Sequence, residues 1–219
     1  MREFCLLVVA KAPVPGLVKT RLCPPMTPVQ AADIAAAALL DTLDAALRTP
    51  GAHPVIALAG ELSAATRRMQ LSEALRHFPV FAQRGSDFAD RLANAHAEVA
   101  RFRPGLPVVQ IGMDTPQVTP ELLASTAARL ARADAVLGPA EDGGWWALGL
   151  NDPQAADVLR TVPMSRSDTG QLTREALEHK GYNVANGALM SDVDTIVDAY
   201  RVASDAWEGR FAAAMRGLG

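Results

Sequence analysis

Cysteine and long apolar runs are scarce in this sequence. The only two cysteines among its 219 residues, Cys5 and Cys23, have neither the spacing of metal ligands nor that of a disulfide framework. No apolar run approaches the roughly 20 residues that a membrane-spanning helix needs. The short apolar segment 4–10 is followed by Lys11 and two prolines, where a signal peptide would carry its cleavage site. We therefore expect a buried strand at 4–10, in a cytoplasmic protein with reduced thiols.

An excess of charge of one sign is also lacking. The net charge is −3, so no basic surface field draws the chain to nucleic acid or to anionic lipid. Hydrophobic residues make up 49% of the chain, which is typical of a folded globular protein, and no change in composition divides it. We expect one domain over residues 1–219 whose partners are small molecules rather than nucleic acid or membranes. The sequence leaves the oligomeric state open.

Several familiar catalytic motifs are absent as well. The four histidines are scattered and belong to no Ser-His-Asp or metal-binding spacing, which indicates packing or surface roles. The G-x-G-x-x-G fingerprint of dinucleotide-binding proteins does not occur. A P-loop needs a glycine directly before its lysine and a helix that starts at once, whereas Val18 precedes Lys19 and the next helix is expected only at Pro28.

Strands and helices are predicted to alternate along the chain. The pattern of apolar residues and turn residues predicts strands at 4–10, 54–58, 80–83, 106–111, 135–137 and 145–150, helices at 28–48, 64–77, 87–102, 120–132, 171–180 and 194–207, and an extended segment at 183–189. This order predicts an α/β protein, a three-layer α/β/α sandwich with a mostly parallel sheet. Because ligands of such sheets bind beyond the carboxyl ends of the strands, the loops after residues 10, 83, 111 and 137 are candidate site loops.

The loop after the first strand carries a local cluster of positive charge. Lys11, Lys19 and Arg21 lie in a segment that Pro15 and Gly16 should hold in a stiff turn. Such a loop suits a polyphosphate, because backbone amides approach through the glycine while the cations neutralise the phosphates. The alternative is a solvated loop with ordinary surface charges.

Acidic residues follow two later segments of the predicted sheet. Asp114 comes directly after the strand at 106–111, where a carboxylate is a natural ligand for Mg²⁺ or Mn²⁺. The alternative is that Asp114 only caps a turn. Asp192 and Asp194 alternate in an extended segment, so one should face the metal and the other should cap the last helix. We expect Asp194 to be the ligand.

A glycine turn precedes two adjacent tryptophans. Asp142, Gly143 and Gly144 read as a tight turn between strands, and a plain β-turn would explain them. Alternation along the strand sends Trp145 and Trp146 to opposite faces. One of them could wall a pocket, although a core role for both is the alternative.

A second polar glycine turn lies before the helix predicted at 87–102. Gln83, Gly85 and Asp87 could hold a base edge or an anion at the start of the helix that carries Arg91. The alternative is an ordinary helix cap by Ser86 or Asp87.

The whole pattern resembles a known bacterial family. Residues 11–16 together with 19–22 are very similar to the opening of a family within the nucleotide-diphospho-sugar transferase (GT-A) superfamily, sometimes labelled a glycosyltransferase linked to arsenosugar synthesis. The resemblance continues at 83–91, 112–116, 138–144 and 192–195, in the same order along the chain. The chain is more distantly similar to 2-phospholactate guanylyltransferase and molybdenum-cofactor guanylyltransferase.

The resemblance implies a role for each segment. By this likeness Lys11, Pro15, Gly16, Lys19 and Arg21 would bind phosphates, Gln83, Gly85 and Asp87 the base, Asp114 and Asp194 the metal, and Asp142, Gly143, Gly144 and Trp145 the acceptor. The sequence departs from the family pattern at Met113, where serine is expected, and at Trp145-Trp146, where tyrosines are usual. The first change should not affect metal binding, and the second leaves the acceptor undefined.

These residues favour a magnesium-dependent transferase. The leading hypothesis is nucleotidyl transfer from a nucleoside triphosphate to a small acceptor, with Lys19 and Arg21 stabilising the pyrophosphate leaving group beside Asp114. The alternatives are glycosyl transfer from a nucleotide-sugar and a non-catalytic nucleotide-binding module.

Overall fold

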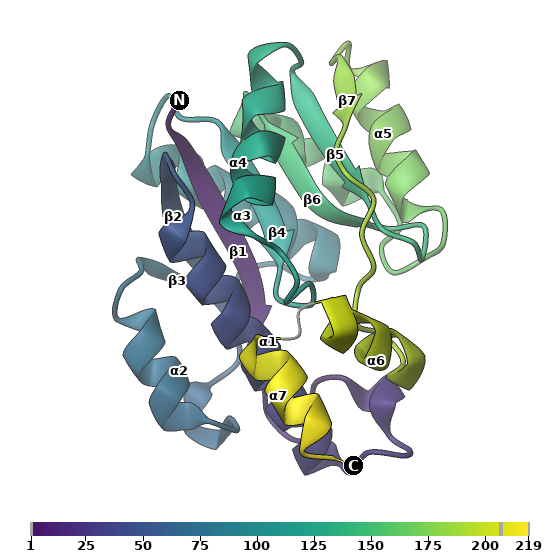
Figure 1. The fold of residues 1–219 in the computed structure, drawn as a ribbon. Helices are drawn as coiled ribbons and strands as arrows, with labels where there is room; N and C mark the ends of the chain where they lie inside the picture. The colour runs from purple at the N-terminus through teal and green to yellow at the C-terminus, as the bar shows by residue number, and fades with distance from the viewer. Residues whose placement is uncertain (1, 206–207, 219) are drawn as a thin grey trace.

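The computed structural model describes residues 2–205 and 208–218, and a seven-stranded sheet forms its centre (Figure 1). The strand order is β3-β2-β1-β4-β6-β5-β7. The strands are β1 Phe4–Lys11, β2 Ala52–Ala59, β3 Val80–Ala82, β4 Val108–Gly112, β5 Ala135–Pro139, β6 Trp145–Leu150 and β7 Val184–Asn186. Strands β3, β2, β1 and β4 pair in parallel, as do β5 and β7, whereas β6 is antiparallel to both its neighbours. The predicted mostly parallel sheet is confirmed.

Helices cover both faces of the sheet. The α-helices are α1 Pro28–Arg48, α2 Arg68–Leu75, α3 Phe88–Phe102, α4 Pro120–Ala128, α5 Thr169–His179, α6 Ile196–Asp205 and α7 Arg210–Arg216, and the short 3-10 helices are η1 Thr20–Leu22, η2 Leu62–Ala64, η3 Arg129–Ala131 and η4 Pro153–Thr161. One hydrophobic core joins the sheet to α1, α2 and α4, and a second joins its other face to α3, η4 and α5. The predicted three-layer α/β/α sandwich is therefore confirmed.

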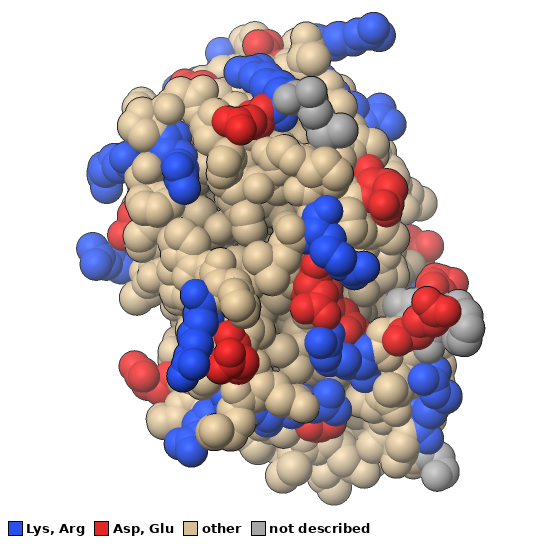
Figure 2. Space-filling view, turned by 60° about the vertical axis from the view of Figure 1, so that its left-hand side comes forward, with Lys and Arg blue, Asp and Glu red and all other residues tan. Residues whose placement is uncertain are grey.

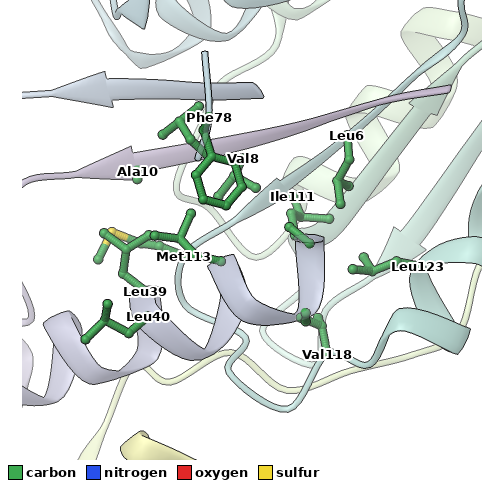
Figure 3. Close-up of a cluster of buried hydrophobic side chains, with 14 of the residues drawn as sticks. Leu6, Val8, Ala10, Leu39, Leu40, Phe78, Ile111, Met113, Val118 and Leu123 are labelled. Carbon is green, nitrogen blue, oxygen red and sulfur yellow. The ribbon is translucent and has the colours of Figure 1, made fainter. Parts of the chain in front are cut away.

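Helix α1 begins where the sequence predicts. Thr27 forms a capping box with Gln30: its hydroxyl accepts from the Gln30 amide at 3.3 Å, and its own amide donates to Gln30 Oε1 at 2.8 Å. The helix then lays alanines and leucines against β1 and β4, as Figure 3 shows for Leu39 near Val8 and Met113. Each leucine buried in this way stabilises the fold by roughly 1.5–3 kcal/mol, and each alanine by less. The packed layer fixes the strand ends from which the site loops leave.

The C-terminal helices differ from the prediction of one helix at 194–207. Helix α6 starts at Ile196 and ends at Asp205, and the last two residues of the predicted helix, 206 and 207, lie outside the described residues. Helix α7 was not predicted. Its start is held by Asp41 of α1, whose carboxylate accepts from the Arg210 and Phe211 amides at 3.0 and 2.8 Å. A contact so distant in sequence leaves no local signal.

The surface agrees with the balanced charge. On the face drawn in Figure 2, basic and acidic side chains are interspersed between wide neutral areas, and the described residues of that face form no extended basic patch. Within residues 2–205 and 208–218, no helix combines the length and hydropathy that a membrane crossing requires.

Candidate functional site

A cleft opens at the carboxyl ends of β1 and β4. Its main cavity has a volume of about 540 Å³, and a smaller cavity of about 280 Å³ extends it along the loop after β1. Lys11, Met113 and Asp114 line both cavities, so the two adjoin. This position beyond the strand ends is where open α/β sheets bind ligands, and the main volume is in the usual range for small-molecule sites.

The basic loop meets the acidic residues in this cleft. The Lys19 ammonium lies 2.8 Å from Asp114 Oδ1 and 3.8 Å from Asp194 Oδ1, and it also donates to the Val193 carbonyl. Arg21 pairs with Asp194 at 2.8 Å. The Lys19 side chain is only 8% exposed and that of Arg21 is 69% exposed. Lys19 is therefore the cation built into the site, and Arg21 lies at its rim.

The backbone of Lys19 is unusual. Its φ of 48° places it in the left-handed region, which side chains other than glycine rarely adopt. Ser165, with φ 60°, also lines the cleft, and Arg67 is the third described non-glycine residue with positive φ. Strain of this kind collects where a fold holds side chains for function.

Asp192 lies among the other acids of the cleft and differs from Asp194 in its contacts. One carboxylate oxygen of Asp192 is buried with no hydrogen-bond partner among the described residues. Burial, followed by the nearby charges of Asp114 and Asp142, raises the pKa of Asp192 to about 7. Asp194 instead pairs with the two cations, and Thr195 rather than an aspartate caps α6, because its hydroxyl accepts from the Asp198 amide at 3.3 Å. The contacts of the two aspartates differ, and the helix cap expected of one of them is made by Thr195 instead, while Asp194 as a metal ligand stays a prediction.

The carboxylates of the cleft suit a hard divalent cation whose coordination is completed by substrate phosphates and water. The described residues hold no group of three or more His, Cys, Asp or Glu side chains able to bind a metal by themselves. Asp114 and Asp192 line the same cavity, however, and the Asp192 oxygen that lacks a hydrogen-bond partner could accept a cation. Mg²⁺ is commonly held by one or two carboxylates together with substrate phosphates and water, so two carboxylates suffice.

The turn after β3 mostly serves the start of α3. Asp87 caps the helix by accepting from the Asp90 amide at 2.8 Å. Gly85 has φ +150°, and a Cβ there would lie 2.7 Å from the Arg91 amide. Gln83 does line the cleft, and its amide nitrogen is bound to the carbonyls of Ala10 and Ala57, each at 2.8 Å. Of these three residues, Gln83 is the one that lines the cleft, and base binding by the three stays a prediction.

The glycine turn before β6 is explained by packing. A Cβ on Gly143 would lie 1.8 Å from the Ser167 carbonyl oxygen, and the Gly143 carbonyl accepts from the Gly170 amide at 2.9 Å. The Gly144 amide donates to Asp142 at 2.8 Å. Asp142 and Gly144 line the cleft, whereas Gly143 holds segment 163–170 against it.

The two tryptophans differ in burial, as strand alternation suggests. Trp146 is 2% exposed and donates to the Ala188 carbonyl at 2.8 Å. Trp145 is half-buried, lines the cleft and donates to the Thr173 hydroxyl at 3.2 Å. Both tryptophans line the cleft, Trp145 with the more exposed side chain, and Met113, the other departure from the family pattern, is a buried core residue at the cleft floor.

Part of the cleft wall was not expected from the sequence. Arg91, Gln110 and Arg166 line it, and the Arg91 Nε is buried with no hydrogen-bond partner among the described residues. Arg166 is held by Asp168 in a two-bonded pair at 2.8–2.9 Å. Arg91 follows a glycine turn, which is a weak signal in the sequence. Nothing in the sequence pointed to Gln110 or Arg166.

Comparison with solved structures gives the same fold. A Desulfovibrio desulfuricans G20 protein, described provisionally as a nucleotide-diphospho-sugar transferase, has a TM-score of 0.85 and 28% identity, covering 99% of this chain and 95% of that one. CMP:2-keto-3-deoxy-manno-octonic acid synthetase in complex with CTP gives 0.57 and 13%, covering 94% and 100%. Rv0371c of Mycobacterium tuberculosis H37Rv in complex with manganese gives 0.52 and 22%, covering 91% and 98%. The last two likenesses show the fold alone.

The sequence itself was compared with curated proteins and with family profiles. No curated protein gave a significant match. Residues 42–166, more than half of the chain, match a family profile. The chain therefore has the nucleotide-diphospho-sugar transferase fold and belongs to the bacterial family described as "Uncharacterized protein conserved in bacteria (DUF2064)".

Proposed function

We propose that this protein is a metal-dependent transferase that uses a nucleotide, most simply a nucleoside triphosphate from which it transfers the nucleotidyl group to a small acceptor. The transferase class follows from the fold and from the likeness to the D. desulfuricans protein. The observation that carries the proposal is the Lys19 ammonium 2.8 Å from Asp114, where the basic loop and the acidic strand end meet in one cleft.

The charges of the cleft suit a triphosphate with a bound cation. Asp114 and Asp192 would hold Mg²⁺ or Mn²⁺, which when bound would neutralise the phosphates and the charge that develops on them. Lys19, Lys11 and Arg21 would take the outer phosphates. Asp194 now neutralises Lys19 and Arg21, so a phosphate would take its place as their anionic partner.

The reaction itself would need positioning more than a nucleophilic side chain. An acceptor oxygen would attack the α-phosphorus, the bond to the bridging oxygen of the β-phosphate would break, and pyrophosphate would leave against Lys19 and Arg21. Catalysis of this kind comes mainly from orientation and from stabilisation of charge. Asp142, Gly144 and Trp145 line the remaining part of the cleft and would border the acceptor.

A second candidate is glycosyl transfer from a nucleotide-sugar, which the likeness to the D. desulfuricans protein favours. The same cation and carboxylates would then hold a diphosphate leaving group. The products separate the two reactions, because nucleotidyl transfer releases pyrophosphate and glycosyl transfer releases a nucleoside diphosphate.

The test is a product assay with each nucleoside triphosphate and nucleotide-sugar, Mg²⁺ or Mn²⁺, and a panel of small acceptors. Pyrophosphate release that depends on the acceptor and disappears in Asp114→Asn supports nucleotidyl transfer, and nucleoside diphosphate release supports the second candidate. Tight nucleotide binding without any turnover would instead indicate a non-catalytic binding module.

A further inference from the structure

Arg91 is a cation of the cleft that the nucleotide chemistry does not use. It projects from the first turn of α3 into the wall of the main cavity. It makes no ion pair within residues 2–205 and 208–218, and its Nε is buried without a partner there. A buried donor that lacks a partner costs free energy, more so when it is charged, so its retention in a cleft indicates a ligand.

None of the neighbouring acids among the described residues forms an ion pair with Arg91. Asp90, next to Arg91 in sequence, accepts from Arg160 at 2.7 Å and from the Ser86 hydroxyl at 2.5 Å. Arg166, the other arginine of this wall, is paired with Asp168. The acids that crowd Asp192 are Asp114, Asp142 and Asp194, and they make no ion pair with Arg91. Arg91 is thus left as the uncompensated cation of this wall.

The surroundings of Arg91 form a defined subsite. Its guanidinium carbon lies 5.7 Å from the centre of the Phe88 ring, a distance at which the ring and the cation attract each other. Gln110 lines the same cavity, and its amide oxygen is bound to His96 Nε2 at 2.9 Å. Burial lowers the pKa of His96 to about 4, so the ring is neutral and donates through Nε2. The Gln110 amide nitrogen is then a donor left for the cleft.

We propose that Arg91 binds the anionic group, a carboxylate or a phosphate, of the acceptor, with Gln110 as a second donor and Phe88 and Trp145 as apolar walls. This inference rests on the proposed function. The phosphates of the nucleotide have their own cations in the loop after β1, and a nucleoside carries no anion at neutral pH. An anion that meets Arg91 therefore comes from the second substrate. The planar fork of arginine suits either oxyanion, because both accept two parallel hydrogen bonds.

Titration calorimetry with two anionic probes and a neutral one tests the proposal. Glycerate presents a carboxylate, glycerol 3-phosphate presents a phosphate, and glycerol presents neither. Each is titrated into the wild type, Arg91→Met, Arg91→Lys and the control Arg101→Met, which changes an exposed arginine at the far end of the same helix. All titrations are run with and without saturating nucleotide and Mg²⁺.

We expect one of the two anions to bind the wild type and Arg101→Met with the same affinity. Glycerol should bind neither protein. The affinity should fall about 10-fold or more in Arg91→Met, with Arg91→Lys between the two, since lysine keeps the charge but not the fork. The anion that binds identifies the acceptor class.

Three results would overturn the proposal: neither anion binds the wild type, the anion binds Arg91→Met as tightly as the wild type, or Arg91→Met weakens nucleotide binding as much as anion binding. The last result would place Arg91 in the nucleotide site. Failure of the proposed function looks different, since the wild type would then bind no nucleotide, or would bind it without turning over any acceptor. Should Arg91→Met not fold, the comparison of Arg91→Lys with the wild type still decides the outcome.

Discussion

The half of the sheet formed by β3, β2, β1 and β4 and the half that contains the antiparallel strand β6 border the same cleft with different chemistry. The parallel half ends in charge, with Lys19 after β1 and Asp114 after β4. The other half contributes a glycine turn and a half-buried tryptophan, and its glycines are needed mainly for close packing against segment 163–170. Parallel strands bring their carboxyl ends to one edge, so ligand-binding groups gather there, whereas the hairpin formed by β5, the glycine turn and β6 contributes another part of the wall.

This difference predicts that mutations in the parallel half damage function without unfolding the protein. We expect Asp114→Asn to reduce transferase activity by about 100-fold or more, equivalent to about 3 kcal/mol, because the carboxylate that would hold the cation is lost. Its melting temperature should stay close to that of the wild type, since the Asp114 side chain is 43% exposed and Lys19 keeps Asp194 and the Val193 carbonyl as partners. Kinetics and calorimetry on the same sample check both expectations, and a variant that unfolds would contradict the separation.

The opposite result is expected for the hairpin. Gly143→Ala should destabilise the fold by about 3 kcal/mol, because the added Cβ would meet the Ser167 carbonyl oxygen. Gly105→Ala is the matched control, since Gly105 also has a positive φ, of +81°, but no atom lies within 4 Å of its added Cβ. It should cost only about 1 kcal/mol. Urea unfolding of both variants measures the difference, and equal losses would show that close packing at Gly143 is unimportant.

A pH effect is predicted on the α3 side of the cleft. Burial lowers the pKa of His96 from 6.5 to about 4, so the unfolded chain binds this proton more readily than the folded one. Stability from this group is therefore present above pH 6.5 and is lost as the pH falls toward 4, by up to about 3 kcal/mol. His96→Gln should flatten the loss over this range, whereas the exposed control His179→Gln should not. Urea unfolding of the wild type and both variants between pH 4 and 7 measures how the free energy of unfolding of each depends on pH.

The smallest predicted effect comes from the repulsion between Asp192 and the other acids of the cleft. Asp192 is crowded by Asp114 and Asp142, and one of its oxygens has no partner among the described residues. Asp192→Asn should therefore stabilise the metal-free protein at pH 8 by about 1 kcal/mol while it lowers activity. Thermal unfolding in a chelating buffer measures the gain. A destabilised variant would mean that the Asp192 carboxylate is part of the packing rather than of the site.

Much of the fold could be predicted because its signals are local. The capping box at Thr27 marked the start of α1, and the apolar run at 4–10 marked β1. Helix α7 could not be predicted, since Asp41 fixes its start from a distant segment.

The site could be predicted only in part, because some of its residues have local signals and others meet only in the folded chain. A strand end followed by Asp114 is visible in sequence, and so is a loop with three cations. Alternation separates Asp192 from Asp194, but only the tertiary contacts of Lys19 and Arg21 show which of them faces the cations. The close approach of Ser167 to Gly143 could not be predicted, because Ser167 comes from a later loop. Arg91 was placed on the correct helix, but its lack of a partner is a property of the folded chain.

The most direct measurement of the central claim is the nucleotide- and metal-dependent shift in melting temperature of the wild type, Lys19→Met and Asp114→Asn, with the exposed Asp205→Asn as control. A nucleotide at about 100 times its dissociation constant adds about 2.7 kcal/mol, which raises the melting temperature of a chain of this size by roughly 5–10 °C. We predict this shift, dependent on Mg²⁺ or Mn²⁺, in the wild type and in Asp205→Asn, and its loss in the other two variants. An equal shift in all four proteins, with or without the metal, would show that Lys19 and Asp114 do not form the nucleotide site.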